Sequence, residues 1–226
     1  KAHTVQTAAG DYPLSQQDTA NAVLYTINKF ATERGEAFDI HSLNDSYEEM
    51  LEETLNHVTE FRRTLSEDDY TMAFQPIVEL GSGHVHHHEC LVRLNNREKF
   101  DNPFEFITFG EQSGLINEFD LAVTEKALNI IDHYKKAGKH VSIAINLSGR
   151  SLGSNLFLDS FLSLLRDQPK LRKQLIVEVT ESYKIEHMKM ANDFIQTLRA
   201  EGTQVCLDDF GSGESSFDYL RHLFVD

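Results

Sequence analysis

Short apolar runs alternate with segments of helical spacing through most of the chain. The runs cover residues 71–80, 84–94, 141–147, 175–180 and 204–208. Between the later runs, apolar residues recur at helical spacing over residues 116–137, 156–166 and 185–199. The runs predict strands, and the segments between them predict amphipathic helices. Because strands and helices alternate through short links, the pattern predicts a parallel α/β fold.

Period-two alternation sorts the side chains of each strand onto two faces. It places Glu89, Asn146, Glu178 and Asp208 inward at or near strand ends, with Asp209 beside them on the following loop. In a parallel barrel the ends of successive strands converge on one face, so these side chains are expected to share a site. A lone acidic residue at a strand end is usually a helix cap or a surface group. Four such placements beside an adjacent Asp are hard to explain in that way.

The adjacent carboxylates indicate a metal site. Two like charges side by side, as in Asp208 and Asp209, are costly to hold without a cation. The expected ligands are oxygens, one of them from an amide, with neither sulfur nor imidazole among them. Such a set favours a hard cation, Mg²⁺ or Mn²⁺, over zinc.

Four histidines, His84, His86, His87 and His88, stand in the second predicted strand. This strand follows the glycine-containing turn 81–83, which predicts a hairpin with the first strand. A zinc site is one interpretation of the histidines. However, alternation places His86 and His88 on one face without an evident third ligand. A polar strand edge at the rim of a barrel is the simpler interpretation.

Helices are expected elsewhere in the chain. Residues 19–34 form an amphipathic pattern, and residues 45–65 repeat apolar positions in the manner of a connector helix. The pair Asn102-Pro103 predicts a further helix start, because proline is tolerated at the first helical position. In the helix over 116–137 one apolar stripe is expected to face the core: Phe119, Val123, Ala127, Ile130, Ile131 and Tyr134.

Composition narrows the classes of function. The chain has 226 residues, of which 40% are hydrophobic and 25% charged, as expected of a soluble globular protein. Its net charge of -15 argues against binding to DNA or an anionic membrane surface. No apolar run approaches the roughly 18 residues of a membrane span, and the first residues lack a signal-peptide layout. A cytoplasmic protein is expected. Any attachment to a membrane would be through a region upstream of this chain. Cys90 and Cys206 lie in strand-like runs and are expected to be buried free thiols.

Five motifs carry a resemblance to a known family. In order, they are Gln75-Pro76-Ile77, Glu89-Cys90-Leu91-Val92-Arg93, Asn146-Leu147-Ser148, Glu178-Val179-Thr180-Glu181-Ser182 and Asp208-Asp209-Phe210-Gly211-Ser212-Gly213. Their order and spacing resemble the EAL-domain phosphodiesterases of cyclic di-GMP, with Cys90 where that family has Ala. The resemblance implies a TIM-like (β/α) barrel with an antiparallel first strand. The last strands, with the family's water-activating Lys and a further metal-binding Glu, are expected beyond Asp226, which makes the chain a fragment or a truncated relative.

The resemblance also implies roles for individual residues. Two divalent cations, Mg²⁺ or Mn²⁺, would be held by Glu89, Asn146, Glu178, Asp208 and Asp209. Of these, the catalytic residues would be Glu89, Asp208 and Asp209. The remaining expected residues serve the substrate and a loop: Arg93 contacts a phosphate, Gln75 and Leu91 line the nucleotide pocket, and Glu181 anchors the loop 210–216.

The implied activity is hydrolysis of cyclic di-GMP to linear pGpG by a two-metal mechanism, in bacterial second-messenger signalling. One alternative is an inactive domain that acts as a cyclic di-GMP receptor or protein-interaction module, and another is a structural dimerisation module. Retention of the five ligand positions favours the enzyme, whereas the missing Lys favours the receptor. The expected partners are cyclic di-GMP and a second copy bound through the barrel, with no DNA.

Three segments are expected along the chain. Residues 1–45 resemble the C-terminal end of a GGDEF domain, but the signature motif of that family is absent, so no cyclase activity is implied. Residues 46–66 are expected to form a connector helix. Residues 67–226 are expected to form the first two thirds of an EAL domain.

Overall fold

The computed structural model describes residues 14–34, 43–96, 100–180, 188–208 and 223–225. The chain divides into a helical unit, Lys1–Thr71 with Leu94–Gly114, and an α/β unit, Met72–Arg93 with Leu115–Asp226. The expected segment boundaries at residues 45 and 66 stay a prediction. No helix in the described ranges is both long enough and apolar enough to cross a membrane.

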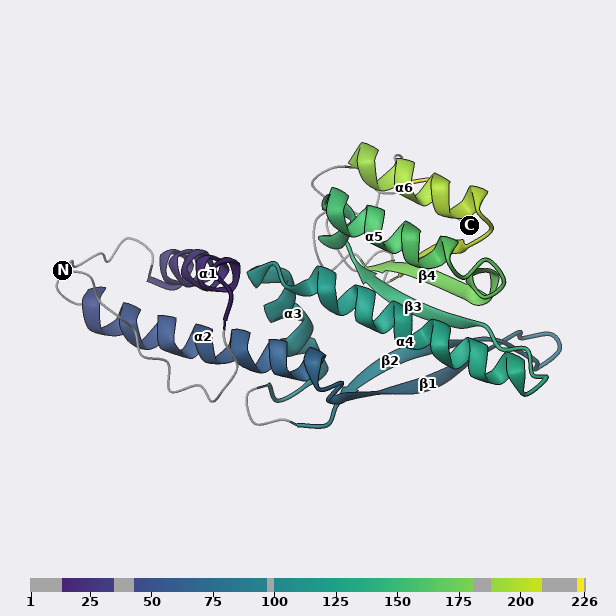
Figure 1. Cartoon of the computed structure of the whole chain (residues 1–226), viewed down its shortest axis with the longest axis horizontal. Coiled ribbons are helices and arrows are strands. Elements are labelled where there is room, and N and C mark those ends of the chain that lie inside the picture. Colours follow the sequence, from purple (N-terminus) through teal and green to yellow (C-terminus); the bar gives the residue numbers. More distant parts are fainter. Residues whose placement is uncertain (1–13, 35–42, 97–99, 181–187, 209–222, 226) are drawn as a thin grey trace. The chain divides into compact units, whose positions relative to one another are not determined.

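The helical unit contains α1 (Gln16–Arg34), α2 (Leu43–Ser66) and α3 (Pro103–Ser113) (Figure 1). Its core is aromatic: Phe61 of α2 stacks on Phe106 of α3 with ring centroids 4.2 Å apart, and both side chains are fully buried. Stacked aromatic pairs contribute about 0.5–1.5 kcal/mol beyond the area they bury. The aromatic pair therefore fixes α3 against α2.

The predicted start of α3 is confirmed. The side chain of Asn102 accepts a hydrogen bond from the Glu105 backbone N–H at 3.0 Å, and Pro103 follows as the first helical residue. The Glu105 carboxylate in turn accepts from the Asp101 N–H at 3.1 Å, which makes a reciprocal cap. Gly114 ends the helix with φ 79°, a left-handed conformation that glycine adopts without steric cost.

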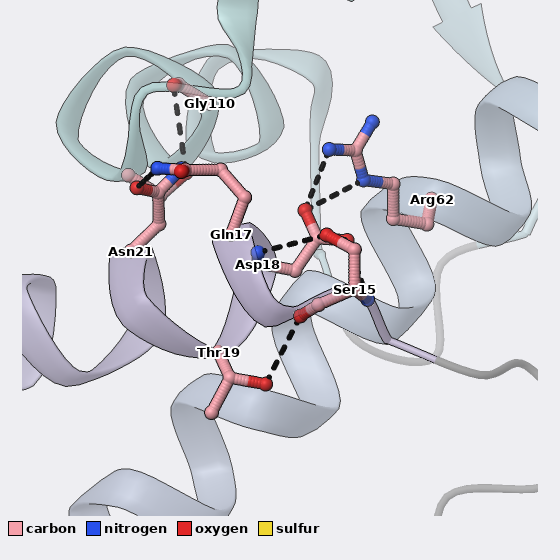
Figure 2. Close-up of polar contacts among 8 residues, drawn as sticks. Ser15, Gln17, Asp18, Thr19, Asn21, Arg62 and Gly110 are labelled. Atoms are coloured by element: carbon pink, nitrogen blue, oxygen red, sulfur yellow. Dashed lines mark hydrogen bonds and ion pairs between the residues drawn. The ribbon is translucent and has the colours of Figure 1, made fainter.

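Figure 2 shows how α1 and α2 are joined through a buried carboxylate. Asp18 Oδ1 accepts hydrogen bonds from Arg62 Nε at 3.0 Å and from Arg62 Nη2 at 2.6 Å. Its Oδ2 accepts from the backbone N–H and the hydroxyl of Ser15, at 3.1 and 2.8 Å. Burial of Asp18 opposes its ionisation, but these hydrogen bonds and the Arg62 charge outweigh it and hold the pKa below its ordinary value.

The α/β unit is built on one sheet with the strand order β1-β2-β3-β4-β5. Strands β2 to β5 pair in parallel, and β1 joins β2 through a hairpin in which the Glu79 N–H donates to the His84 carbonyl at 2.9 Å. Along the chain, α4 precedes β3, α5 connects β3 to β4, and α6 connects β4 to β5 (Figure 1). The strand bounds are β1 (Tyr70–Val78), β2 (Val85–Leu94), β3 (Ile143–Ser148), β4 (Leu175–Thr180) and β5 (Gln204–Asp208). The helix bounds are α4 (Ile116–Lys136), α5 (Asn155–Arg166) and α6 (Met188–Ala200), with 3-10 turns at Ser151–Gly153 and Arg172–Gln174.

Register and burial confirm the predicted sorting of the strand faces. One face of β3, β4 and β5 is almost fully buried: Ile143, Ile145, Leu147, Leu175, Val177, Val179 and Val205. On the other face Asn146 pairs with Glu178, and Glu89 of β2 pairs with Ala144. Because a parallel register preserves the alternation, Glu89, Asn146, Glu178 and Asp208 all lie on this second face.

Some details differ from the expectations. Strand β3 begins at Ile143, two residues later than the predicted run, and the carbonyl of Val141 before it accepts a hydrogen bond from Gln174 Nε2 at 2.7 Å. Tyr134, expected in the core, is 39% exposed, and Ile130 is half-buried. Both cysteines are free, as expected, but Cys206 is only half-buried.

Candidate metal centre

Three carboxylates predicted to share a site are brought together by β2, β4 and β5. One ligand oxygen from each of Glu89, Glu178 and Asp208 lies within 4.8 Å of the other two, and all three side chains are half-buried. The parallel register explains this, because each strand presents an acidic residue to the same face of the sheet. The separation allows the three oxygens to bind a shared cation, since metal–oxygen bonds of about 2.0–2.6 Å bring two ligands of one ion within roughly 5 Å.

Asn146 completes this group from β3. Its Nδ2 donates to Glu89 Oε1 at 3.3 Å, while its Oδ1 is buried without a hydrogen-bond partner among the described residues. A buried acceptor without a donor costs about 1–3 kcal/mol. An amide oxygen is also a ligand that hard cations accept. The orphaned oxygen beside three carboxylates therefore fits a bound divalent cation.

The electrostatics of the site point in the same direction. Burial, followed by the charges of Asp208 and Glu89, raises the pKa of Glu178 to about 7. The raised pKa means that a negative charge on Glu178 is unfavourable beside the other two carboxylates. A divalent cation would lower the pKa of Glu178 again, because it stabilises the ionised form of every carboxylate around it.

His87 of β2 faces the same carboxylates. Its Nε2 lies 3.9 Å from Glu178 Oε1, and the two side chains are only 14% and 15% exposed. Burial, together with the neighbouring His86 and His88, lowers the pKa of His87. The contact is therefore not an ordinary ion pair, because such a pair would raise the pKa of the histidine and lower that of the carboxylate.

The other expected site residues are more loosely placed. Leu91 and Arg93 alternate with Glu89 along β2 and so share its face; Leu91 is half-buried and Arg93 is exposed. Gln75 lies in the middle of β1 and is exposed. The Arg93 guanidinium donates from Nη1 to the Val92 carbonyl at 2.9 Å. Asp209, Glu181 and the loop 210–216 lie outside the described residues.

Sequence reasoning missed His87 as a member of this group. The zinc interpretation considered the face shared by His86 and His88, whereas His87 lies on the opposite face. The signal was nevertheless present, because His87 stands two positions before Glu89 and strand alternation places both on one side.

Comparisons with known proteins place this geometry in a family context. The family model described as EAL domain matches residues 58–226. The chain is 31% identical over 169 residues to cyclic di-GMP phosphodiesterase NbdA of Pseudomonas aeruginosa, covering 74% of this chain and 22% of the relative. It is also 31% identical over 169 residues to cyclic di-GMP phosphodiesterase PdeR of Escherichia coli, covering 74% of this chain and 25% of the relative. The chain thus spans about a quarter of the length of these curated relatives.

Solved structures show the same fold. The PaMucR phosphodiesterase in complex with c-di-GMP superposes with a TM-score of 0.64 at 26% identity, over 75% of this chain and 70% of that chain. The FimX EAL domain of Xanthomonas citri in complex with c-diGMP gives a TM-score of 0.62 at 23% identity, over 75% of this chain and 66% of that chain.

Proposed function

This chain belongs to the EAL domain family, and we propose that it hydrolyses cyclic di-GMP to linear pGpG with the help of two divalent cations. The TIM-like fold of that family is confirmed by the solved EAL domains that superpose on the chain. The observation that carries the proposal is the cluster of Glu89, Glu178 and Asp208, with the orphaned Asn146 oxygen beside it. The homologues named as cyclic di-GMP phosphodiesterases support the choice of substrate.

The described residues divide the work between holding metal and holding substrate. Glu89, Asn146, Glu178 and Asp208 would hold the cations, with Asp209 as the predicted fifth ligand. When bound, divalent cations supply an activated water and stabilise the charge that develops on the phosphate. Arg93, exposed on the same strand face as Glu89, would orient a phosphate through its planar guanidinium. Gln75 and Leu91 would contact the nucleotide, and the fixed strand positions of the carboxylates keep the site pre-organised.

A non-catalytic receptor for cyclic di-GMP is the second candidate. The c-di-GMP held in the PaMucR structure, which is 26% identical to this chain, supports nucleotide binding by this fold. The same face would bind the nucleotide in both cases, so binding alone does not separate the two functions. Turnover in the presence of Mg²⁺ or Mn²⁺ does.

The deciding experiment is Glu89→Gln in the natural protein, because this substitution keeps the size of the side chain and removes its charge. We expect the hydrolysis rate to fall about 10²-fold or more, roughly 3 kcal/mol of transition-state stabilisation, since the carboxylate acts by holding a cation. Affinity for cyclic di-GMP should change by about tenfold or less, because binding energy common to substrate and transition state is mostly retained. Rates are measured by separating pGpG from cyclic di-GMP.

The matched control is Glu79→Gln, the same exchange at an exposed position before the hairpin turn. It should leave both rate and affinity unchanged. A wild-type protein that binds cyclic di-GMP but does not hydrolyse it with either cation would replace the enzyme proposal by the receptor.

A further inference from the structure

We propose that the imidazole of His87 is a nitrogen ligand of the metal centre, which makes the site selective for transition cations such as Mn²⁺ and Co²⁺ over Mg²⁺. The inference rests on the proposed function only in requiring that the carboxylate cluster binds a cation. It concerns a residue that the expected oxygen-only ligand set does not contain. Nitrogen ligands suit first-row transition metals, whereas Mg²⁺ prefers oxygen and keeps several waters.

The distance between His87 and Glu178 fits two ligands of one ion. His87 Nε2 and Glu178 Oε1 are 3.9 Å apart, which is too long for a direct hydrogen bond. Two atoms bound to the same cation at about 2.0–2.2 Å can be separated by at most roughly 4.0–4.4 Å. The separation lies within this limit, so one ion between the two atoms can contact both.

The position of His87 on β2 directs it to this place. Strand alternation puts His87 on the face that carries Glu89, while His86 and His88 belong to the opposite face. The side chain of His87 is only 14% exposed. A half-buried imidazole beside the Glu178 carboxylate is better placed for ligation than the exposed His84 and His86 nearer the hairpin turn.

The second nitrogen of His87 already has a partner. Its Nδ1 lies 2.8 Å from His86 Nδ1, a hydrogen bond in which one ring donates and the other accepts. When His87 is the donor, its Nε2 carries a lone pair that faces Glu178. Metal-bound histidines commonly donate their other N–H in this way, which fixes both tautomer and orientation.

A second observation indicates that this face of the sheet holds a further group. Asn146 Oδ1 is buried without a hydrogen-bond partner among the described residues, and Asn146 Nδ2 donates to Glu89 of the carboxylate cluster. The competing explanation is the other tautomer of His87, in which Nε2–H faces Glu178 and takes no part in metal binding.

Pulsed electron paramagnetic resonance of the Mn²⁺-loaded protein separates these explanations directly. A coordinated imidazole produces ¹⁴N modulation of the Mn²⁺ spin echo, whereas oxygen ligands and water do not. We expect this modulation in the wild type, its loss in His87→Gln, and its retention in His88→Gln. His88 is a matched control because it is also half-buried in β2 and lies on the other face.

Cation affinities provide a second readout. His87→Gln should weaken Co²⁺ binding about tenfold or more, by analogy with the loss of groups that orient metal ligands. Mg²⁺ binding should change less than about threefold, because Mg²⁺ draws little on nitrogen ligands. Equal weakening of both cations would overturn the inference, since it would show a general loss of the site.

The outcomes distinguish this inference from the proposed function. Mn²⁺ that binds the wild type without ¹⁴N modulation overturns the role of His87 and leaves the oxygen site of the proposed function standing. Modulation that persists in His87→Gln also overturns it, because another nitrogen would be the ligand. A folded wild type that binds no Mn²⁺ contradicts both.

Discussion

At the scale of the residue, Glu178 is where the charge of the candidate centre is concentrated. Burial and the neighbouring Asp208 and Glu89 raise its pKa to about 7, compared with an ordinary value near 4.5. A carboxyl whose pKa is raised by folding contributes stability below the unfolded value and loses that contribution as pH rises through the folded value. Without a cation, therefore, the site opposes folding increasingly between about pH 4.5 and pH 7.

This cost predicts a trade between stability and metal binding. In a chelator at about pH 8, above the raised pKa of Glu178, Glu178→Gln should melt at a higher temperature than the wild type, because a repelled carboxylate has been removed. The same variant should lose most of the rise in melting temperature that Mn²⁺ gives the wild type, since a cation stabilises only through binding the folded state. Thermal melts with and without Mn²⁺ measure both effects. A variant that is destabilised in chelator would show that Glu178 is favourably placed without a cation.

At the scale of the element, the ion pair between Asp18 and Arg62 joins α1 to α2. The carboxylate side chain is 6% exposed and the guanidinium 18%, so solvent screens the pair far less than it screens surface ion pairs. The same carboxylate accepts two hydrogen bonds from Ser15, the residue before α1, and its negative charge in the first turn suits the helix dipole. One side chain thus starts α1 and attaches it to α2.

Asp18→Asn should therefore reduce the free energy of unfolding by about 1.5–3 kcal/mol near neutral pH, the usual loss for a hydrogen bond to a charged group. The pKa of Asp18 is lowered on folding, so its contribution is present above the unfolded value of about 4 and is lost as pH falls through the folded value. Urea unfolding should consequently show a smaller difference between variant and wild type in acid.

The matched control is Glu67→Gln, which breaks the ion pair with Arg63 at a 57% exposed carboxylate. It should cost less than about 1 kcal/mol, because exposed pairs contribute little. A loss for Asp18→Asn as small as that of the control would contradict the role given to the buried pair.

At the scale of the whole molecule, the candidate centre belongs to one of the two units. Glu89, Asn146, Glu178 and Asp208 all come from strands of the α/β unit, and the helical unit supplies none of the described ligands. Local stability in proteins is not uniform, and a ligand protects most strongly the cooperative region that binds it. The two units should therefore respond differently to metal.

Hydrogen exchange tests this expectation. Addition of Mn²⁺ should slow amide exchange in β2, β3, β4 and β5. The exchange rate should fall about tenfold for each roughly 1.4 kcal/mol by which Mn²⁺ raises the free energy of local opening. Exchange in α1 and α2 should stay the same within error. The Glu178→Gln variant serves as the control and should show little slowing anywhere. Comparable protection of α1 and α2 by Mn²⁺ would contradict the independence of the two units in metal binding.

The sequence by itself determined the elements, the strand faces and the acidic residues of the candidate centre. Period-two alternation is a property of any extended chain, so Glu178 and Asp208 could be assigned to one face without knowledge of the fold. A local signal also sufficed for the start of α3, because Asn102 and Pro103 act within the first helical turn. The five motifs supplied the family for the same reason: each is a short, local pattern.

Only the tertiary structure decided which of these residues meet, because that depends on strand register and on the lengths of neighbouring elements. The parallel register brings His87 to 3.9 Å from Glu178, a contact between residues that no local pattern connects. Tertiary structure also decided the environment of Tyr134, which the helical pattern assigns to the core. It lines an open pocket with Ile130, Val141 and Ile143 and is 39% exposed, because its neighbours leave this part of α4 uncovered.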